Sequence, residues 1–469
     1  MNKFLFLLGI TGIFIFLQCK SKESYKEAGV AVLEGKITTP AGPSFIIEIN
    51  GEMKDIPLKQ DGTFSADLNI PGAGIYKVFS GPQGMFLPVY LQPGKTTSIN
   101  ADAANYIMSA RYEGGTKIEN EFLISRIINE PTLLQIDQTT LFTLSEEDFL
   151  KQVEEIKTKL IDFKKEFQKQ NGVFNEYFEE IVNQDISFQV TNLKMYYPDY
   201  YNFLVKTNDF SPSENFYSFF NSLDINNEIN LNSDHFKTFV PLYIEHLVKI
   251  KQKESDTYES SGINQLSILN EVFKNARIKE EMAFQIIKQS FETKLAEAFA
   301  MYDVYMKISS NENKKKAVEN LYNLWLPLKP GNPAPAFSGK DKNGKLHTKD
   351  QLKGKVLYID VWATWCGPCL AELPHLEQLQ EKFKSSKNIE FISVSIDQNE
   401  EPWRKMVEDK KMKGLQIYAT GAWNAEIITN YKIQGIPRFI IIDKEGNMVD
   451  GNAPRPSNSA TYEILNKLI

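Results

Sequence analysis

The sequence predicts a multidomain protein with an N-terminal all-β sandwich-like domain, an all-α middle region and a C-terminal α/β domain. Short alternating apolar runs fill residues 28–112, and apolar residues recur at helical spacing over 116–326. Over 330–469, strand-like and helix-like patterns alternate. A chain of 469 residues is too long for one small domain, and its length fits about three.

The β prediction rests on short runs that alternate apolar and polar residues, at 45–49, 74–79 and 85–91. Turn signals separate these runs at Asn50-Gly51, Asp61-Gly62 and Pro93-Gly94. Strands at such regular spacing indicate a small sandwich. The segment carries no catalytic constellation, and we interpret its apolar stripes as core rather than as a ligand site.

The helical prediction is clearest over residues 144–170, where Ser145 and Asp148 are spaced as a capping box. Further amphipathic stretches follow at 175–197, 234–251, 264–288 and 291–308. We interpret their many Phe and Tyr residues as core, with a peptide-binding groove as the alternative. The proline-rich run 326–336 cannot continue a helix and is interpreted as the linker to the last domain.

Two cysteines at Cys-x-x-Cys spacing, Cys366 and Cys369, follow an apolar strand-like run and begin a helix-like one. A structural zinc site would need two further Cys or His ligands. The third cysteine, Cys19, is distant in the sequence, and the four histidines form no Cys/His cluster. We therefore expect no metal and interpret the pair as a redox dithiol.

The order of residues assigns a role to each thiol. A helix N-terminus stabilises a thiolate, so Cys366, the first and more exposed thiol, is the predicted nucleophile. Cys369 lies one turn further in and can attack the resulting mixed disulfide. Gly367 keeps the turn uncrowded, and Pro368 suits the first helical turn because its missing amide hydrogen costs little there.

Residues 355–374, Lys-Val-Leu-Tyr-Ile-Asp-Val-Trp-Ala-Thr-Trp-Cys-Gly-Pro-Cys-Leu-Ala-Glu-Leu-Pro, resemble the strand, active site and kinked first helix of the TlpA/ResA-like membrane-tethered thioredoxins. Residues 337–346 look like the N-terminal hairpin of that family. The resemblance implies a thioredoxin fold over 330–469. More weakly, residues 28–110 look like the β domain that often precedes thioredoxin domains in such lipoproteins.

Further on, Gly435-Ile436-Pro437 before an apolar strand is similar to the family's cis-proline loop. In the family this loop packs beside the dithiol and offers backbone to an extended peptide. The resemblance thus implies that Ile436 and Pro437 bind substrate. The other predicted substrate-binding residues are Trp365, Gly367 and Pro368.

Two carboxylates are candidate catalytic residues. Strand alternation places Asp360 in an apolar, central strand, where burial would raise its pKa. By resemblance it matches thioredoxin's buried acid, which assists deprotonation of the second cysteine; a strand-end aspartate in water is the alternative. Glu372 shares a helix face with Cys369 and matches a glutamate that ResA-like proteins keep near the dithiol. Its alternative is an ordinary solvated helix glutamate.

Residues 402–420 are an addition relative to small cytosolic thioredoxins, and they predict a helix at 403–412 and a strand at 415–419. Such an insertion is typical of the TlpA/ResA and peroxiredoxin-related branch. A peroxiredoxin-like peroxide reductase is therefore the nearest enzymatic alternative. The motif that holds the attacking cysteine of peroxiredoxins is not found in this sequence.

The N-terminus predicts export. Lys3 precedes an apolar run, 4–17, that is short for a membrane span, and Cys19 follows at once. The pattern resembles a bacterial lipoprotein signal over 1–18, with lipid on Cys19 and a polar tether over 19–27. An uncleaved anchor and plain secretion are the alternatives.

These observations predict a lipid-anchored thiol:disulfide oxidoreductase of the bacterial envelope, facing the periplasm, with no cofactor. Gly367-Pro368 matches thioredoxin, a reductant, so we expect it to reduce disulfide-containing client proteins with electrons from a membrane donor. Cytochrome c maturation is a process that its relatives serve. A net charge of −7 without a basic block argues against nucleic acid as a partner. The competing class is a surface or periplasmic interaction lipoprotein with an incidental dithiol.

Overall fold

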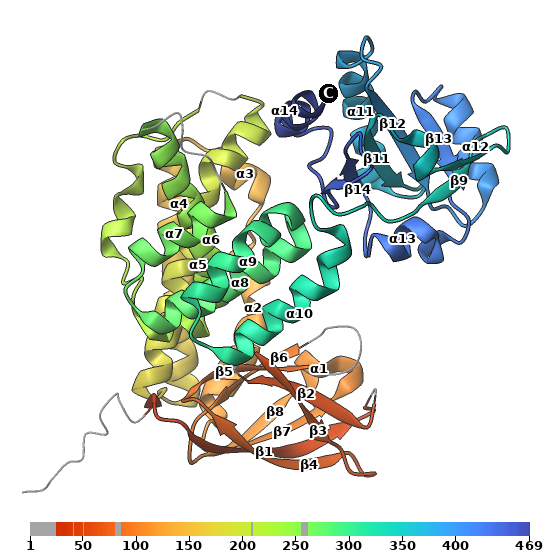
Figure 1. Cartoon of the computed structure of the whole chain (residues 1–469). Coiled ribbons are helices and arrows are strands. Elements are labelled where there is room, and N and C mark those ends of the chain that lie inside the picture. The colour runs from red at the N-terminus through yellow and green to blue at the C-terminus, as the bar shows by residue number, and fades with distance from the viewer. Residues whose placement is uncertain (1–24, 41, 50, 80–85, 208–209, 255–260) are drawn as a thin grey trace, which may run out of the picture. The chain divides into compact units, whose positions relative to one another are not determined.

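The structure is a computed structural model that describes residues 25–40, 42–49, 51–79, 86–207, 210–254 and 261–469 (Figure 1). The chain divides into two compact units, Met1–Phe239 and Val240–Ile469. Cys19, the predicted signal segment and most of the tether lie outside the described residues. Among the helices that are described, none is both long enough and apolar enough to cross a membrane.

The first unit begins with two four-stranded sheets, which confirm the predicted sandwich-like architecture (Figure 1). One sheet has the order β4-β1-β7-β8 and the other β3-β2-β5-β6. Strand β1 is antiparallel to β4 and parallel to β7. The strands are β1 Gly29–Thr38, β2 Ser44–Ile49, β3 Glu52–Pro57, β4 Thr63–Ile70, β5 Gly74–Phe79, β6 Phe86–Leu91, β7 Thr96–Asp102 and β8 Arg111–Gly114.

Alternate side chains of the two sheets form one core, which includes Leu33, Ile47, Leu87 and Ile99. Between β1 and β7 the backbones approach closely at Gly35, which has φ +142°. A Cβ at this position would lie 1.9 Å from the carbonyl oxygen of Ile99, so only glycine fits there.

Helices follow the sandwich, as predicted. Their bounds are α1 Tyr106–Ser109, α2 Lys117–Leu134, α3 Gln138–Phe142, α4 Glu146–Asn171, α5 Glu176–Val205 and α6 Asp234–Glu254, with 3-10 helices at Phe216–Ser222 and Glu228–Asn232. The hydroxyl oxygen of Ser145 accepts the Asp148 amide and caps α4, but it also donates to the Asp148 carboxylate. The reciprocal bond of a full capping box, from the Ser145 amide to Asp148, is replaced by this hydroxyl contact.

A buried asparagine joins the sandwich to the helices. The Asn120 side chain, in α2, accepts a hydrogen bond from the Tyr90 amide at 2.7 Å and donates to the Tyr90 carbonyl at 3.0 Å. It therefore pairs with the edge of β6 as a neighbouring strand would. This contact fixes α2 at the edge of the second sheet.

The second unit begins within α6, and the next helices are α7 Gly262–Val272, α8 Ala276–Thr293, α9 Leu295–Ile308 and α10 Glu312–Trp325. The stretch predicted over 264–288 is two helices rather than one. Asn275 has extended backbone angles, and its side chain accepts the Ile278 amide at 3.0 Å, so it begins a new helix. The stretch predicted from Phe291 likewise divides, because Phe291 still belongs to α8.

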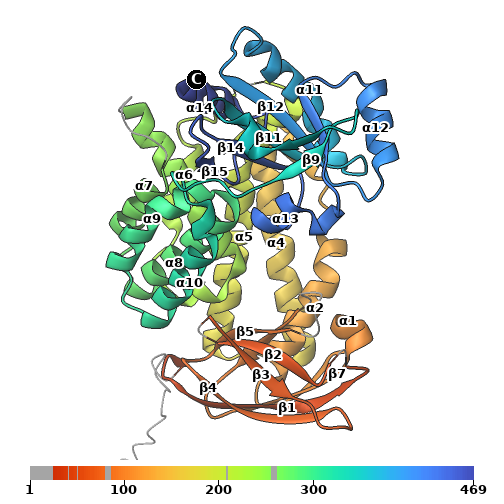
Figure 2. The same ribbon diagram turned by 45° about the vertical axis from the view of Figure 1, so that its right-hand side comes forward.

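The C-terminal part contains a seven-stranded sheet with the order β10-β9-β13-β12-β11-β14-β15 (Figure 2). The strands are β9 Ser338–Lys340, β10 Leu346–Thr348, β11 Val356–Trp362, β12 Ile389–Ser395, β13 Leu415–Tyr418, β14 Arg438–Ile442 and β15 Met448–Asp450. The helices are α11 Gly367–Lys382, α12 Glu400–Asp409, α13 Glu426–Asn430 and α14 Ser459–Leu468. Helix α12 and strand β13 occupy the predicted insertion.

Strand β11 is buried along its whole length, between β12 and β14. On one face of the sheet, Tyr358 packs with Leu376 of α11 and Leu465 of α14. Because side chains alternate along a strand, Asp360 lies on this same face, beneath the helices.

Candidate active site

A disulfide joins Cys366 and Cys369 where β11 gives way to α11. Cys366 is the N-cap residue of the helix, and its Sγ accepts a hydrogen bond from the Cys369 amide at 3.2 Å. The sulfur thus takes the place of the capping oxygen of a Ser or Asp. An amide N–H and the positive end of the helix dipole therefore both point at Cys366 and favour its thiolate over its thiol.

The turn that carries the disulfide is tight but open on one side. The Cys366 amide donates to the Ala363 carbonyl at 3.1 Å. Apart from its two chain neighbours and the backbone of its own helix, no atom lies within 4 Å of the position that a Cβ would take at Gly367, so no other segment crowds this side of the turn. Pro368 lies in the first helical turn, as predicted.

The two sulfurs are nearly equally buried. Cys366 is 4% exposed and Cys369 is 2% exposed, so the expected difference in access is small in the oxidised protein. The physical reason is that the disulfide holds the Cys366 sulfur against the buried Cys369 sulfur. The Cα atoms of the two cysteines are 5.2 Å apart. The electrostatic difference, with Cys366 at the helix N-terminus, remains.

The Ile436-Pro437 peptide bond is cis. Strand β14 runs antiparallel to β11, with Arg438 opposite Val361, so Pro437 lies where β11 leads into the cysteine turn. Ile436 and Pro437 are half-buried. The backbone of this loop is thus presented at the same end of β11 as the disulfide.

Asp360 is 3% exposed and faces Ser393 and Phe439 across the neighbouring strands. Burial, followed by the nearby charge of Glu372, raises its pKa from the ordinary 3.8 to about 8, although a hydrogen bond with Ser393 opposes this shift. The alternative of a solvated strand-end aspartate is therefore wrong. A carboxyl with a pKa near neutrality can exchange a proton with a thiol.

Glu372 is also buried, at 8% exposure. Its two oxygens accept the amide of Ser457 at 3.0 Å and the hydroxyl of Ser457 at 2.9 Å, and Arg455 lies 3.8 Å away. The alternative of an ordinary solvated glutamate is wrong. The side chain instead holds the segment before α14 against α11.

Sequence reasoning missed a third buried carboxylate, Asp397. It accepts the Thr364 amide at 3.1 Å and the Thr364 hydroxyl at 2.7 Å, and it also accepts the Ser395 hydroxyl at 2.7 Å. Asp397 therefore anchors the turn before Trp365 to the end of β12. A signal was present, because β11 and β12 are parallel neighbours and the residues after their carboxyl ends meet at one edge of the sheet.

The surface beside the disulfide is aromatic. Trp365 is 58% exposed and lies 6.4 Å, centroid to centroid, from the ring of Trp423, which is 41% exposed. A cavity of about 340 Å³ lies next to Trp365 and is lined by Thr364, Asp397 and Pro402, among others. Exposed aromatic rings next to a reactive pair offer apolar contact to an incoming chain.

This arrangement can exchange two electrons through the two sulfurs. Over the described ranges, no three His, Cys, Asp or Glu side chains are grouped so that they could hold a metal ion. The chemistry that the two neighbouring sulfurs offer is thiol–disulfide exchange.

Comparison with known proteins agrees with this chemistry. A model of the Redoxin family matches residues 329–466. Thiol-disulfide oxidoreductase ResA of Bacillus cereus is 32% identical over 120 residues, which are 26% of this chain and 67% of that protein. ResA of Bacillus subtilis is 26% identical over 141 residues, 30% of this chain and 75% of that protein. The thioredoxin domain of a Bacteroides vulgatus thiol-disulfide oxidoreductase is 31% identical, with a TM-score of 0.28, over 30% of this chain and 97% of that chain.

Proposed function

This chain belongs to the ResA family of thiol-disulfide oxidoreductases, and we propose that its Cys366–Cys369 pair reduces disulfide bonds of client proteins in the bacterial envelope. The observation that carries the proposal is the hydrogen bond from the Cys369 amide to the Cys366 Sγ at the start of α11. It supports Cys366 as the attacking thiolate and Cys369 as the second thiol.

In the reduced protein, the Cys366 thiolate attacks one sulfur of the client disulfide. A mixed disulfide forms, and the other client sulfur leaves as a thiolate. Cys369 then loses its proton and attacks the Cys366 Sγ, which releases the second client sulfur. The client gains two electrons and two protons, and the disulfide between Cys366 and Cys369 is the oxidised product.

Three groups support this sequence of steps. The raised pKa of Asp360 suits it to accept the Cys369 proton near neutral pH. Burial is the main cause of that raised pKa, and the charge of Glu372 raises it further. The client chain binds a surface beside the disulfide. This surface is made by the cis-proline loop at Ile436-Pro437, the exposed Trp365, Gly367 and Pro368.

The proposed direction is reduction, because Gly367-Pro368 matches the reductant thioredoxin. Each turnover leaves the dithiol oxidised, so an electron donor must restore it, and we propose that this donor lies in the membrane. Lipid attachment at Cys19 would hold the protein at that membrane, and cytochrome c maturation is a process that such a reductant would serve. Loss of membrane partitioning in a Cys19→Ala variant, with the protein still exported, would support the lipid anchor.

An insulin-reduction assay tests the activity. The full chain, kept reduced with dithiothreitol, should accelerate precipitation of the insulin B chain well above the rate with dithiothreitol alone. Cys366→Ser should return the rate to that background, while Trp325→Phe, a change outside the site, should not. An inert wild-type chain would favour the interaction-protein alternative, and faster consumption of peroxide than of insulin disulfide would favour a peroxide reductase.

A further inference from the structure

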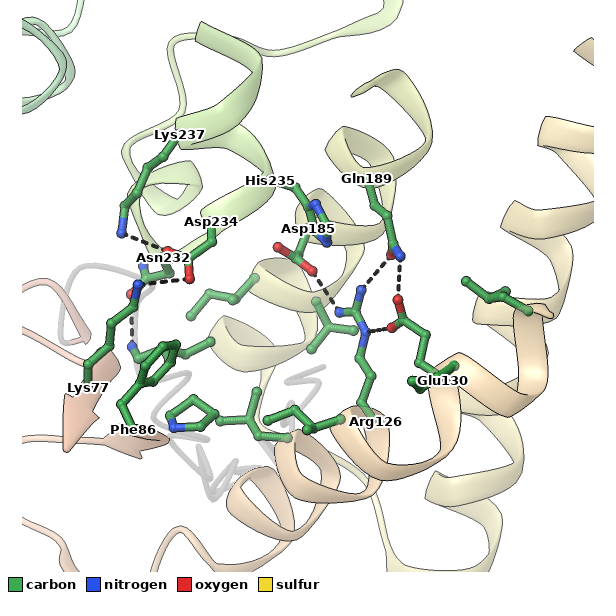
Figure 3. A pocket seen from close by; sticks show the side chains of 18 of the residues that line it. Lys77, Phe86, Arg126, Glu130, Asp185, Gln189, Asn232, Asp234, His235 and Lys237 are labelled. Atoms are coloured by element: carbon green, nitrogen blue, oxygen red, sulfur yellow. Dashed lines mark hydrogen bonds and ion pairs between the residues drawn. The ribbon is translucent and has the colours of Figure 1, made fainter. Parts of the chain in front are cut away.

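A second cavity lies in the first unit, among β5, β6, α2, α5 and the start of α6 (Figure 3). Its volume is about 670 Å³, within the range of about 300–1,000 Å³ that is typical of small-molecule sites. Every residue that lines it belongs to Met1–Phe239, whereas the disulfide lies in Val240–Ile469. The cavity is therefore distinct from the redox site.

The walls between its polar ends are apolar. The side chains that matter for the argument are Ile75, Phe86, Leu123, Ile127, Ile181 and Val182. Phe86 on β6 and Ile127 on α2 are 37% and 40% exposed, so apolar surface on both walls faces the open cavity. An apolar ligand body would remove this surface from water, which is favourable.

One polar end of the cavity is internally satisfied. The Arg126 guanidinium donates through three different nitrogens to Glu130, Asp185 and Gln189, each at 2.7 Å (Figure 3). Gln189 in turn donates to Glu130. Two carboxylates thus surround one cation, and the cluster has a net charge of −1. We interpret it as the tie between α2 and α5 rather than as a ligand contact.

The other polar end has spare donors. Asp234 pairs with Lys77 at 3.0 Å and with Lys237 at 3.4 Å, which leaves a net charge of +1. Although burial opposes the shift, the two lysines lower the pKa of Asp234, so it stays ionised. Each ammonium carries three N–H donors, and its bond to Asp234 uses one of them. Lys77 also lies 4.8 Å from the centre of the Phe86 ring, where the cationic end meets the apolar wall.

From this distribution we propose that the cavity binds a small amphipathic anion, a free single-chain carboxylic acid with its carboxylate at Lys77 and Lys237 and its apolar chain between Phe86 and Ile127. Charge complementarity selects the orientation, because the opposite end is net negative and its arginine is already bonded. The ligand needs no chemistry from the disulfide, and its binding is a separate property of the first unit.

Titration calorimetry on the full chain tests the charge. Decanoate should bind at one site per chain, and decyltrimethylammonium, with the same apolar chain and the opposite charge, about tenfold more weakly or not at all. The Lys77→Met, Lys237→Met double variant should bind decanoate about tenfold more weakly than the wild type and should bind decanol with unchanged affinity. Lys165→Met, a charge change at an exposed position of α4, is the matched control. Equal affinity for both ions would overturn the proposal.

A second pair of variants tests the location. Ile127→Trp should fill the cavity and abolish decanoate binding, whereas Val173→Trp, at a position that is 79% exposed and outside the cavity, should not. Circular dichroism checks that each variant is folded; if Ile127→Trp does not fold, the lysine variants decide alone. Tighter binding of a short apolar peptide with a free carboxylate than of decanoate would overturn the proposal in favour of a chain terminus as occupant.

Discussion

Asp397 and Thr364 join the ends of the parallel neighbours β12 and β11. The Asp397 carboxylate accepts the Thr364 amide at 3.1 Å and the Thr364 hydroxyl at 2.7 Å. Thr364 precedes Trp365 and Cys366, so the contact fixes the start of the turn that carries the disulfide. Because Asp397 is buried, these bonds replace the water that the carboxylate loses on folding.

Thr364→Val keeps the shape of the side chain and removes the hydroxyl bond to Asp397. We expect the free energy of unfolding of the second unit to fall by about 1 to 3 kcal/mol, because the variant leaves the buried Asp397 carboxylate without one of its hydrogen-bond donors. Tryptophan fluorescence reports that unit alone, since all five tryptophans lie between residues 325 and 423. Thr293→Val is the control, because the Thr293 side chain is exposed and its hydroxyl donates only to a carbonyl of its own helix. A Thr364→Val transition that matches the wild type would contradict the anchoring role.

Asp360→Asn should stabilise the second unit near neutral pH. The pKa of Asp360 is about 8 in the folded protein against an ordinary 3.8, so between these values the folded chain keeps a proton that the unfolded chain has lost. The contribution of Asp360 to the free energy of unfolding is then fully present below about pH 4. It decreases as the pH rises to about 8 and does not change above that pH. At pH 7 the asparagine variant avoids this loss, which amounts to at most about 4 kcal/mol.

Unfolding curves of the oxidised protein at several pH values check this prediction. The difference in unfolding free energy between Asp360→Asn and wild type should grow by about 3 kcal/mol from pH 5 to pH 7. Asp443→Asn provides the comparison for a carboxylate that lies after a strand of the same sheet. A difference that does not change with pH would mean that Asp360 titrates normally.

The same proton should appear in the kinetics. If Asp360 accepts the Cys369 proton, Asp360→Asn should slow release of the mixed disulfide, with little effect on the first attack by Cys366. In the wild type the release rate should rise with pH around the Asp360 pKa of about 8. Glu372→Gln should slow release less and move this midpoint downwards, because the Glu372 charge raises the Asp360 pKa.

Stopped-flow measurements of single turnovers separate the two steps. Glu377→Gln is the matched control, since Glu377 is an exposed residue of the same helix and pairs with Lys413. Unchanged release in both the Asp360 and Glu372 variants would remove these residues from the mechanism.

The sequence predicted features that are local, and it missed those that join distant segments. The three regions, the Cys-x-x-Cys at a helix start and the buried Asp360 follow from patterns within a few residues. Periodicity also overestimated the length of one helix. The apolar spacing continues across Asn275, although the backbone leaves the helical conformation at that residue. Contacts such as Asp397 with Thr364 and Glu372 with Ser457 span 33 and 85 residues, and only the order of strands and helices brings them together.

The redox potential tests the proposed direction of electron flow. If Gly367-Pro368 makes the pair a reductant, the Cys366/Cys369 couple should lie nearer thioredoxin, at about −270 mV, than the oxidant DsbA, at about −120 mV. Equilibration with dithiothreitol or glutathione buffers, followed by thiol alkylation and mass measurement, gives the value. A potential near the oxidising end would replace reduction by oxidation as the activity.

The roles of the two cysteines can be separated by trapping clients. Cys366 caps α11 and accepts the Cys369 amide, so its thiolate is favoured, whereas Cys369 lies one turn inside the helix. Cys369→Ser should attack client disulfides and stay attached, because no second thiol follows. Cys366→Ser should trap little or nothing. Non-reducing gels of envelope extracts should therefore show adducts only with Cys369→Ser, and these should disappear with dithiothreitol. Equal trapping by both variants would overturn the assignment of Cys366 as the nucleophile.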